Sequence, residues 1–111
     1  MSKGQHLGEF EQFILLALLR VRREGYGMTV RREIEETTGR DVSIGSVYAT
    51  LERLETKGYL SSQHVDPEPD RGGKPRRIYA VTRAGLRALD QTREALAKMW
   101  DGVAIKAARS R

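Results

Sequence analysis

Apolar side chains recur at helical spacing in two segments near the start of the chain. Residues 8–23 are apolar around nearly the whole circumference of the predicted helix, so more than one of its faces must be covered. One face can meet the domain's own core and the other a second subunit; a central helix wrapped by its own chain is the alternative. Residues 28–38 predict a shorter amphipathic helix that ends at Gly39.

A third helix is predicted over residues 43–57, with Ser43 as its N-cap and Gly58 as its stop. Its apolar positions lie at intervals of three and four, which predicts one buried face made of Ile44, Val47, Leu51 and Leu54. The opposite face carries small, hydroxyl and basic side chains, which let a helix approach phosphates and base edges. They are Ser43, Gly45, Ser46, Ala49, Thr50 and Arg53. A solvated helix face is the alternative reading.

Two strand-like segments, 59–65 and 78–81, flank a stretch that contains three prolines and two glycines. This pattern predicts a β-hairpin with an irregular tip, and Val42 is a candidate for a brief third strand. The tip and the returning strand carry four basic side chains, while three acidic ones lie on the outgoing side. The basic residues are Arg71, Lys74, Arg76 and Arg77. Either they contact a polyanion, or the segment is a polar loop whose charges keep it hydrated.

A last helix is predicted over residues 83–105, with Thr82 as its N-cap. Its apolar stripe keeps spacings of three, four or seven: Leu86, Leu89, Leu96, Trp100 and Val103. No part of the preceding domain is left to cover this stripe. The simplest way to cover the stripe is with a second copy of the chain, through either the same helix or the first helix, which carries Phe10 and Phe13. The sequence therefore predicts a homodimer. Packing on the chain's own first helix is the alternative, and residues 106–111 are expected to be a disordered basic tail.

Composition narrows the choice of partner. The chain has 111 residues, enough for one domain, and its 20 basic against 15 acidic residues give a net charge of +5. Such an excess favours DNA, RNA or an anionic membrane surface. No apolar run approaches the ~20 residues of a membrane span, and the N-terminus lacks the apolar segment of a signal peptide, so we expect a cytoplasmic protein.

The sequence assembles no catalytic or metal-binding pattern. Cysteine is absent, and His6 and His64 are far apart with no partner at ligand spacing, so we predict neither a metal nor a cofactor. No nucleophile is paired with a base, and Gly72-Gly73 matches no phosphate-binding loop, so we predict that the protein is not an enzyme. A protein-binding winged-helix adaptor is the alternative function. It would need exposed apolar residues on helix 43–57, where the sequence has serine, threonine and arginine.

Four stretches together resemble the PadR family of bacterial transcriptional regulators, in its short subfamily with a single C-terminal helix. They cover roughly residues 7–100 and read LGEFEQFILLALL, GYGMTVRREIEETTG, SIGSVYATLERLETKGYLSS and RGGKPRRIYAVTRAGLRAL. The resemblance implies a mainly α fold with a small β-hairpin: a winged helix-turn-helix over residues 7–82 and a dimerisation helix over residues 83–105. It also implies a homodimeric repressor that binds a roughly palindromic DNA operator.

The resemblance also implies roles for single residues. Tyr48 would touch the phosphate backbone, Ser43, Ser46 and Thr50 would face the groove, and the wing arginines would reach phosphates or the minor groove. A small hydrophobic effector, often aromatic, would bind between the C-terminal helices and release the DNA. Trp100 lies about one turn later than the tryptophan expected in such a site, with Leu96 nearer that place, so packing in the dimer contact is the alternative for Trp100.

Overall fold

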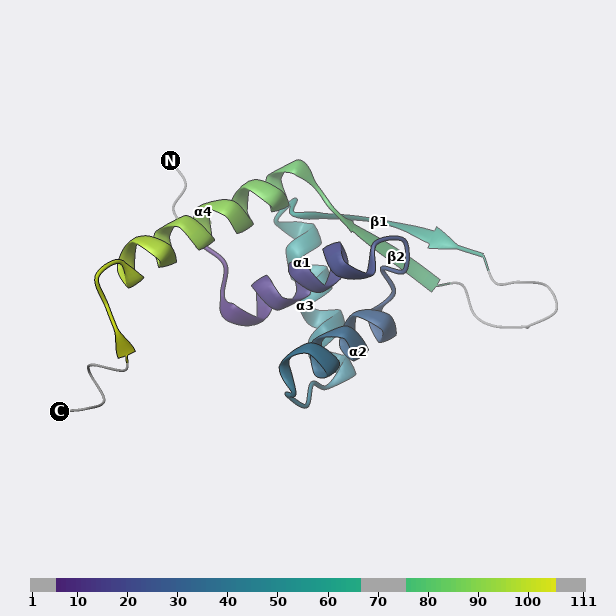
Figure 1. Cartoon of the computed structure of the whole chain (residues 1–111). Coiled ribbons are helices and arrows are strands. Elements are labelled where there is room, and N and C mark those ends of the chain that lie inside the picture. The colour runs from purple at the N-terminus through teal and green to yellow at the C-terminus, as the bar shows by residue number, and fades with distance from the viewer. Residues whose placement is uncertain (1–5, 67–75, 106–111) are drawn as a thin grey trace.

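The computed structural model describes residues 6–66 and 76–105 (Figure 1). Its elements are α1 (Glu9–Val21), α2 (Gly27–Thr38), α3 (Ile44–Thr56), β1 (Leu60–Val65), β2 (Arg76–Val81) and α4 (Arg83–Trp100). The hairpin of β1 and β2 projects from one side of the cluster of α1, α2 and α3, and α4 extends from the other (Figure 1). This is a winged helix-turn-helix followed by a long C-terminal helix, so the fold predicted from the sequence is confirmed.

The hydrophobic core lies where α1, α2 and α3 meet. Its fully buried large side chains come from all three helices: Ile14, Leu15, Val30, Val47, Leu51 and Leu54. Burying one such side chain contributes about 1.5–3 kcal/mol, so each member of this cluster stabilises the packing of the three helices. Leu60 and Tyr79 of the two strands are also buried and close the core on the hairpin side.

Local capping chemistry sets the boundaries of α3 and α4. Ser43 Oγ accepts a hydrogen bond from the Ser46 backbone N–H at 3.1 Å, and Thr82 Oγ1 accepts one from the Gly85 N–H at 3.1 Å. Gly58 follows α3 with a φ of 85°, a left-handed conformation that glycine adopts without a Cβ clash. The predicted caps and the predicted stop are therefore confirmed.

The wing is an antiparallel pair in which all six residues of β1 face partners in β2. Val42 does not add a strand to the described part of this sheet, so that prediction is wrong. Its N–H donates to Glu35 Oε2 at 2.9 Å and its carbonyl accepts from Arg31 Nε at 2.8 Å, which holds the turn against α2. The outer edge of β2 instead meets the segment after α1, where the Tyr79 N–H donates to the Gly25 carbonyl at 2.9 Å.

The helix α4 contacts the rest of the described chain mainly through its first turns. Gly85 and Ala88 are buried, whereas every residue from Arg93 to Trp100 is exposed. A turn at residues 101–102, where Gly102 has a φ of 79°, ends the helix at Trp100. The prediction of a continuous helix to residue 105 is therefore wrong, and the predicted tail at 106–111 lies outside the described residues.

Candidate nucleic-acid interface

The N-terminus of α3 presents two hydroxyl groups to solvent. Ser43 and Ser46 are both exposed, and their Oγ atoms are hydrogen-bonded to each other at 2.7 Å. A helix N-terminus carries a partial positive charge and unpaired N–H groups, which suit an anion such as phosphate. Both serines therefore lie where the sequence predicted them, on an exposed helix start with the chemistry to meet a DNA backbone.

Tyr48 packs against the first residue of α2 and remains 47% exposed. Its ring lies so close to Gly27 that a Cβ added there would be 2.5 Å from the ring atoms Cε1 and Cζ. Only glycine at position 27 lets the ring take this place. The contact fixes the direction of a side chain that stays accessible, as a residue that contacts DNA requires.

Thr50, in contrast, does not lie on the exposed face of α3. Thr50 is only 3% exposed, and its Oγ1 accepts a hydrogen bond from Arg53 Nη2 at 3.4 Å. Thr50 follows Val47 by three positions and precedes Leu54 by four, and both of those are fully buried, so helical spacing turns it inward. The prediction that Thr50 faces the groove is wrong.

Arg53 is exposed on one side and tied to α1 on the other. Its side chain is 51% exposed, and its Nε donates to Glu11 Oε2 at 3.1 Å. Lys57 Nζ donates to the same oxygen at 2.9 Å, and the Gly8 N–H donates to Glu11 Oε1 at 3.0 Å. Arg53 therefore holds α3 against α1, and only the rest of its guanidinium group faces solvent.

Glu11 is a buried carboxylate that the sequence reasoning missed. Burial alone would raise its pKa, but the hydrogen bonds from Gly8, Lys57 and Arg53 outweigh burial and hold the pKa below its ordinary value of 4.5. The ionised group joins α1 to the C-terminal half of α3. Its position three residues after Gly8, the spacing of a capping box, was the available signal.

The two described wing arginines have different partners. Arg76 and Arg77 are neighbours in β2, so their side chains point to opposite faces of the hairpin. The guanidinium carbon of Arg76 lies 4.1 Å from the centroid of the Tyr26 ring, in a cation–π contact. Arg77 instead donates from Nη1 to Ser62 Oγ at 2.8 Å and contacts His64 Nε2 through Nη2 at 2.8 Å.

Tyr26 and Gly27, at the start of α2, connect the wing to α3. The Arg76 side chain of the wing packs on the Tyr26 ring, and the Tyr48 ring of α3 packs on Gly27. Two adjacent residues of the chain therefore position the Arg76 guanidinium group and the Tyr48 phenol group. We call this region, with Ser43 and Ser46 at the start of α3, the α3–wing edge. The other predicted wing contacts lie outside the described residues: Arg71 and Lys74.

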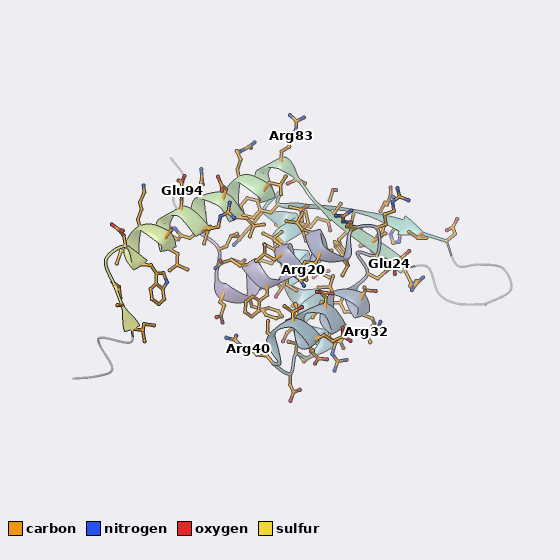
Figure 2. The ribbon with its side chains drawn as sticks, viewed as in Figure 1. Arg20, Glu24, Arg32, Arg40, Arg83 and Glu94 are labelled. Atoms are coloured by element: carbon orange, nitrogen blue, oxygen red, sulfur yellow. The ribbon has the colours of Figure 1, made fainter. Side chains whose placement is uncertain are left out.

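A separate surface is an apolar groove between α1 and α4, which we call the α1–α4 groove. Its volume is about 810 Å³, and most of its lining is apolar: Leu16, Leu19, Leu86, Leu89, Leu96, Ala97 and Trp100. Figure 2 shows Arg83 and Glu94 pointing from the side of α4 that faces away from α1. The leucines of α4 line the groove, and three charged side chains of the same helix lie beside them: Arg87, Asp90 and Arg93.

The residues predicted for dimerisation divide between this groove and the core. Four of them line the groove: Leu86, Leu89, Leu96 and Trp100. Phe10 and Phe13 are partly buried against the chain's own core, and the guanidinium carbon of Arg40 lies 5.1 Å from the Phe13 ring centroid. Leu16 and Leu19 supply the exposed side of α1 instead. Phe10 and Phe13 are not part of the groove lining, and their role in dimerisation stays a prediction.

The sequence matches known proteins along the same elements. The family described as "Transcriptional regulator PadR-like family" matches residues 15–91, from α1 into α4. The chain belongs to this family. As a PadR-like transcriptional regulator it is a winged-helix DNA-binding protein and not an enzyme, which confirms the predicted family, the predicted kind of partner and the absence of enzymatic activity.

One curated relative and two solved structures show how far the likeness extends. The chain is 38% identical over 78 residues to Transcriptional regulator Rv3488 of Mycobacterium tuberculosis, a match that covers 68% of this chain and 66% of that protein. It is 27% identical to a PadR family transcriptional regulator from Eggerthella lenta, with a TM-score of 0.68 and coverage of 85% and 81% of the two chains. F93 from STIV, a winged-helix DNA-binding protein, is 19% identical with a TM-score of 0.67 over 85% and 94% of the chains, and shows the fold alone.

In the part of this PadR-like regulator that the structure describes, no group of three or more histidine, aspartate or glutamate residues is placed to hold a metal ion. Among the same residues, no helix combines the length and the apolar character needed to cross a lipid bilayer.

Proposed function

We propose that this PadR-like regulator is a homodimeric repressor that binds a palindromic operator through α3 and the wing. The observation that carries the proposal is the α3–wing edge, where Ser43, Ser46, Tyr48 and Arg76 are exposed together. Hydroxyl, phenol and guanidinium groups are the side chains that contact phosphates and base edges. The net charge of +5 per chain, which doubles to +10 in a dimer, also favours a polyanion. Since its target would be chromosomal DNA, we expect the protein to act in the cytoplasm.

The alternative of a protein-binding adaptor needs apolar residues on the same edge. On α3 and on the described strands, Tyr48 is the one large apolar or aromatic side chain that is exposed. The other exposed large apolar side chains of the described residues belong to α1, α2, α4 and the segment after α4. The α3–wing edge therefore has the composition of a DNA contact.

Selection of bound sequences from a random duplex pool tests the proposed operator. A two-fold dimer should select inverted half-sites whose centres are about one helical turn, ~10 base pairs, or a multiple of that apart. If the dimer contacts about eight phosphates, log affinity should fall against log salt with a slope near −7. A flat salt response, or selected sequences without inverted symmetry, would contradict the proposal. Transcription in vitro from a promoter that carries the selected site should then fall as the protein is added.

The proposed dimer uses the α1–α4 groove, because this is where α4 leaves apolar side chains uncovered. Leu96 is 54% exposed there, in the half of α4 that the chain itself does not cover. Leu96→Asp should convert the dimer to a monomer in sedimentation equilibrium, because a second copy would have to bury the new carboxylate. Ala95→Asp is the matched control: it adds the same charge one residue away, at an exposed position outside the groove lining. Equal masses for the two variants would refute this interface.

We also propose that a flat hydrophobic effector binds beside Leu96 and Trp100 in the α1–α4 groove and releases the DNA. The groove volume of about 810 Å³ is within the range of small-molecule sites. Trp100 is the single tryptophan of the chain, so its fluorescence reports binding directly. A planar aromatic dye should quench this fluorescence and lower operator affinity together. If the dye quenches Trp100 and operator affinity stays constant, binding in the groove does not control the DNA contact.

A further inference from the structure

Arg76 and Arg77 carry the same charge at adjacent positions, but their surroundings differ. Arg77 lies opposite His64 in the strand register, and Ser62 lies two residues before His64 on the same face of the hairpin. Arg77 Nη1 donates to Ser62 Oγ and Nη2 donates to His64 Nε2, both at 2.8 Å. The second bond requires the neutral ring with its proton on Nδ1, since Nε2 must offer its lone pair.

Ser62 extends this chain of hydrogen bonds to α3. Its hydroxyl donates to Glu55 Oε2 at 2.6 Å while its oxygen accepts from Arg77. Each bond polarises the next, because the carboxylate makes the hydroxyl oxygen a better acceptor for the guanidinium group. The charge of Glu55 also offsets that of Arg77. The returning strand of the wing is therefore connected to α3 through three side chains.

Arg76 is in the opposite situation. Its guanidinium group lies over the Tyr26 ring, and within the described residues it makes no hydrogen bond or ion pair, so its N–H donors are available to an outside acceptor. Tyr26 itself is fixed at the start of α2. Its N–H donates to the Glu24 carbonyl at 2.8 Å, and its carbonyl accepts from the Val30 N–H at 2.9 Å. Arg76 thus packs on a fixed aromatic ring, and its N–H donors have no partner among the residues that the structure describes.

We propose that the two arginines have separate roles: Arg76 binds a DNA phosphate, and Arg77 is a positioning residue that holds the wing against α3 through Ser62 and Glu55. The inference rests on the DNA contact proposed for the α3–wing edge. Arg77 already uses two of its five N–H donors within the wing, and moving its guanidinium group towards a phosphate would break those bonds. Arg76 can bind one while it stays on Tyr26.

The test compares Arg76→Ala with Arg77→Ala, two neighbouring substitutions that each remove one positive charge per chain. Affinity for the selected duplex is measured between about 50 and 200 mM salt, and each lost phosphate contact should flatten the log–log slope by about 0.9. Arg76→Ala in both subunits of the dimer should therefore flatten the slope by about 2. Arg77→Ala should weaken binding at every salt concentration with the slope of the wild type. Equal flattening by the two variants would overturn the proposal.

Two further variants separate positioning from charge. Ser62→Ala removes the hydrogen bonds that link Arg77 to Glu55 and leaves the net charge unchanged. It should therefore weaken DNA binding as Arg77→Ala does, with the salt slope of the wild type. Ser62→Thr keeps the hydroxyl group and should restore binding. Arg77→Lys keeps the charge but lacks the planar fork that reaches both Ser62 and His64, so it should behave like Arg77→Ala. Wild-type affinity in Ser62→Ala or in Arg77→Lys would show that the chain of hydrogen bonds does not position the wing.

Amide hydrogen exchange in the free protein distinguishes a failure of this inference from a failure of the proposed function. Exchange in β1 and β2 should accelerate in Arg77→Ala and Ser62→Ala, because the brace to α3 is lost, and should be unchanged in Arg76→Ala. Unchanged exchange in the first two variants would overturn the positioning role without reference to DNA. If the wild-type protein bound no duplex at all, the proposed function would fail instead, and the exchange data would still decide whether Arg77 braces the wing.

Discussion

Replacing Glu11 with glutamine should destabilise the protein by about 2–3 kcal/mol. Glu11 is 7% exposed, and its carboxylate accepts hydrogen bonds from the Gly8 N–H at 3.0 Å, Arg53 Nε at 3.1 Å and Lys57 Nζ at 2.9 Å. Hydrogen bonds to charged groups contribute about 1.5–3 kcal/mol each. Arg53 and Lys57 are partly exposed and can turn to water, and glutamine can still accept from Gly8. The expected loss is therefore nearer the value of one such bond than of three.

The same substitution should lose its effect in acid. The folded-state pKa of Glu11 is lowered from its ordinary value of 4.5, by hydrogen bonds that outweigh the opposing effect of burial. A depressed carboxyl pKa stabilises the folded state above the unfolded value, and this contribution disappears as pH falls through the folded-state pKa. The difference in free energy of unfolding between wild type and Glu11→Gln should thus be full at pH 7 and shrink steadily below pH 4.5.

Thermal unfolding at fixed protein concentration measures this difference. At about 4 °C per kcal/mol for a domain of this size, Glu11→Gln should lower Tm at pH 7 by roughly 8–12 °C. Glu9→Gln is the matched control in the same helical turn. Glu9 also pairs with an arginine, Arg40 at 2.7 Å, but both side chains are exposed, so its loss should change Tm little. Equal Tm values for the two variants at pH 7 would refute the anchoring role of Glu11.

Three glycine substitutions test close contacts. Gly27→Ala should displace the Tyr48 ring, which would lie 2.5 Å from the added Cβ, and so lower operator affinity in gel-shift assays more than it lowers Tm. Gly85→Ala should lower Tm strongly, because its Cβ would lie 2.4 Å from the Tyr59 carbonyl oxygen, a backbone atom that cannot rotate away. Gly45→Ala meets nothing within 4 Å and should leave Tm unchanged or slightly raised; a loss as large as that of Gly85→Ala would contradict the steric reasoning.

Features set by local chemistry could be predicted from the sequence. The caps at Ser43 and Thr82 each bond to an N–H three residues ahead, so the residues that decide them stand together in the sequence. The hairpin is equally local, since its turn-forming residues separate the two strands that pair. The apolar stripe of α4 was also predicted correctly as an uncovered surface, because the preceding domain has no element left to pack on that helix.

Contacts between distant segments could not be predicted in the same way. Arg53 and Lys57 are 42 and 46 residues from Glu11, and no local pattern shows that both bind one of its oxygens. The contact of Arg76 with Tyr26 spans a similar separation. Thr50 was misplaced for a related reason. A hydroxyl suggests exposure, but it is tolerated in a buried place when it has a hydrogen-bond partner, here Arg53 Nη2 at 3.4 Å.

The helix α1 connects the two surfaces of the molecule, since it contacts α2, α3, β2 and α4. Leu16 and Leu19 line the α1–α4 groove, Glu11 bonds to α3, and Gly25, just beyond the helix, accepts from Tyr79 in β2. A shift of α1 should therefore move α3 and the wing together. If filling the groove releases DNA by this route, Glu11→Gln, studied well below its Tm, should bind the aromatic dye normally but show less release of the operator. Unreduced release would mean that the groove acts on the DNA-binding surface through α4 and the subunit contact rather than through α1.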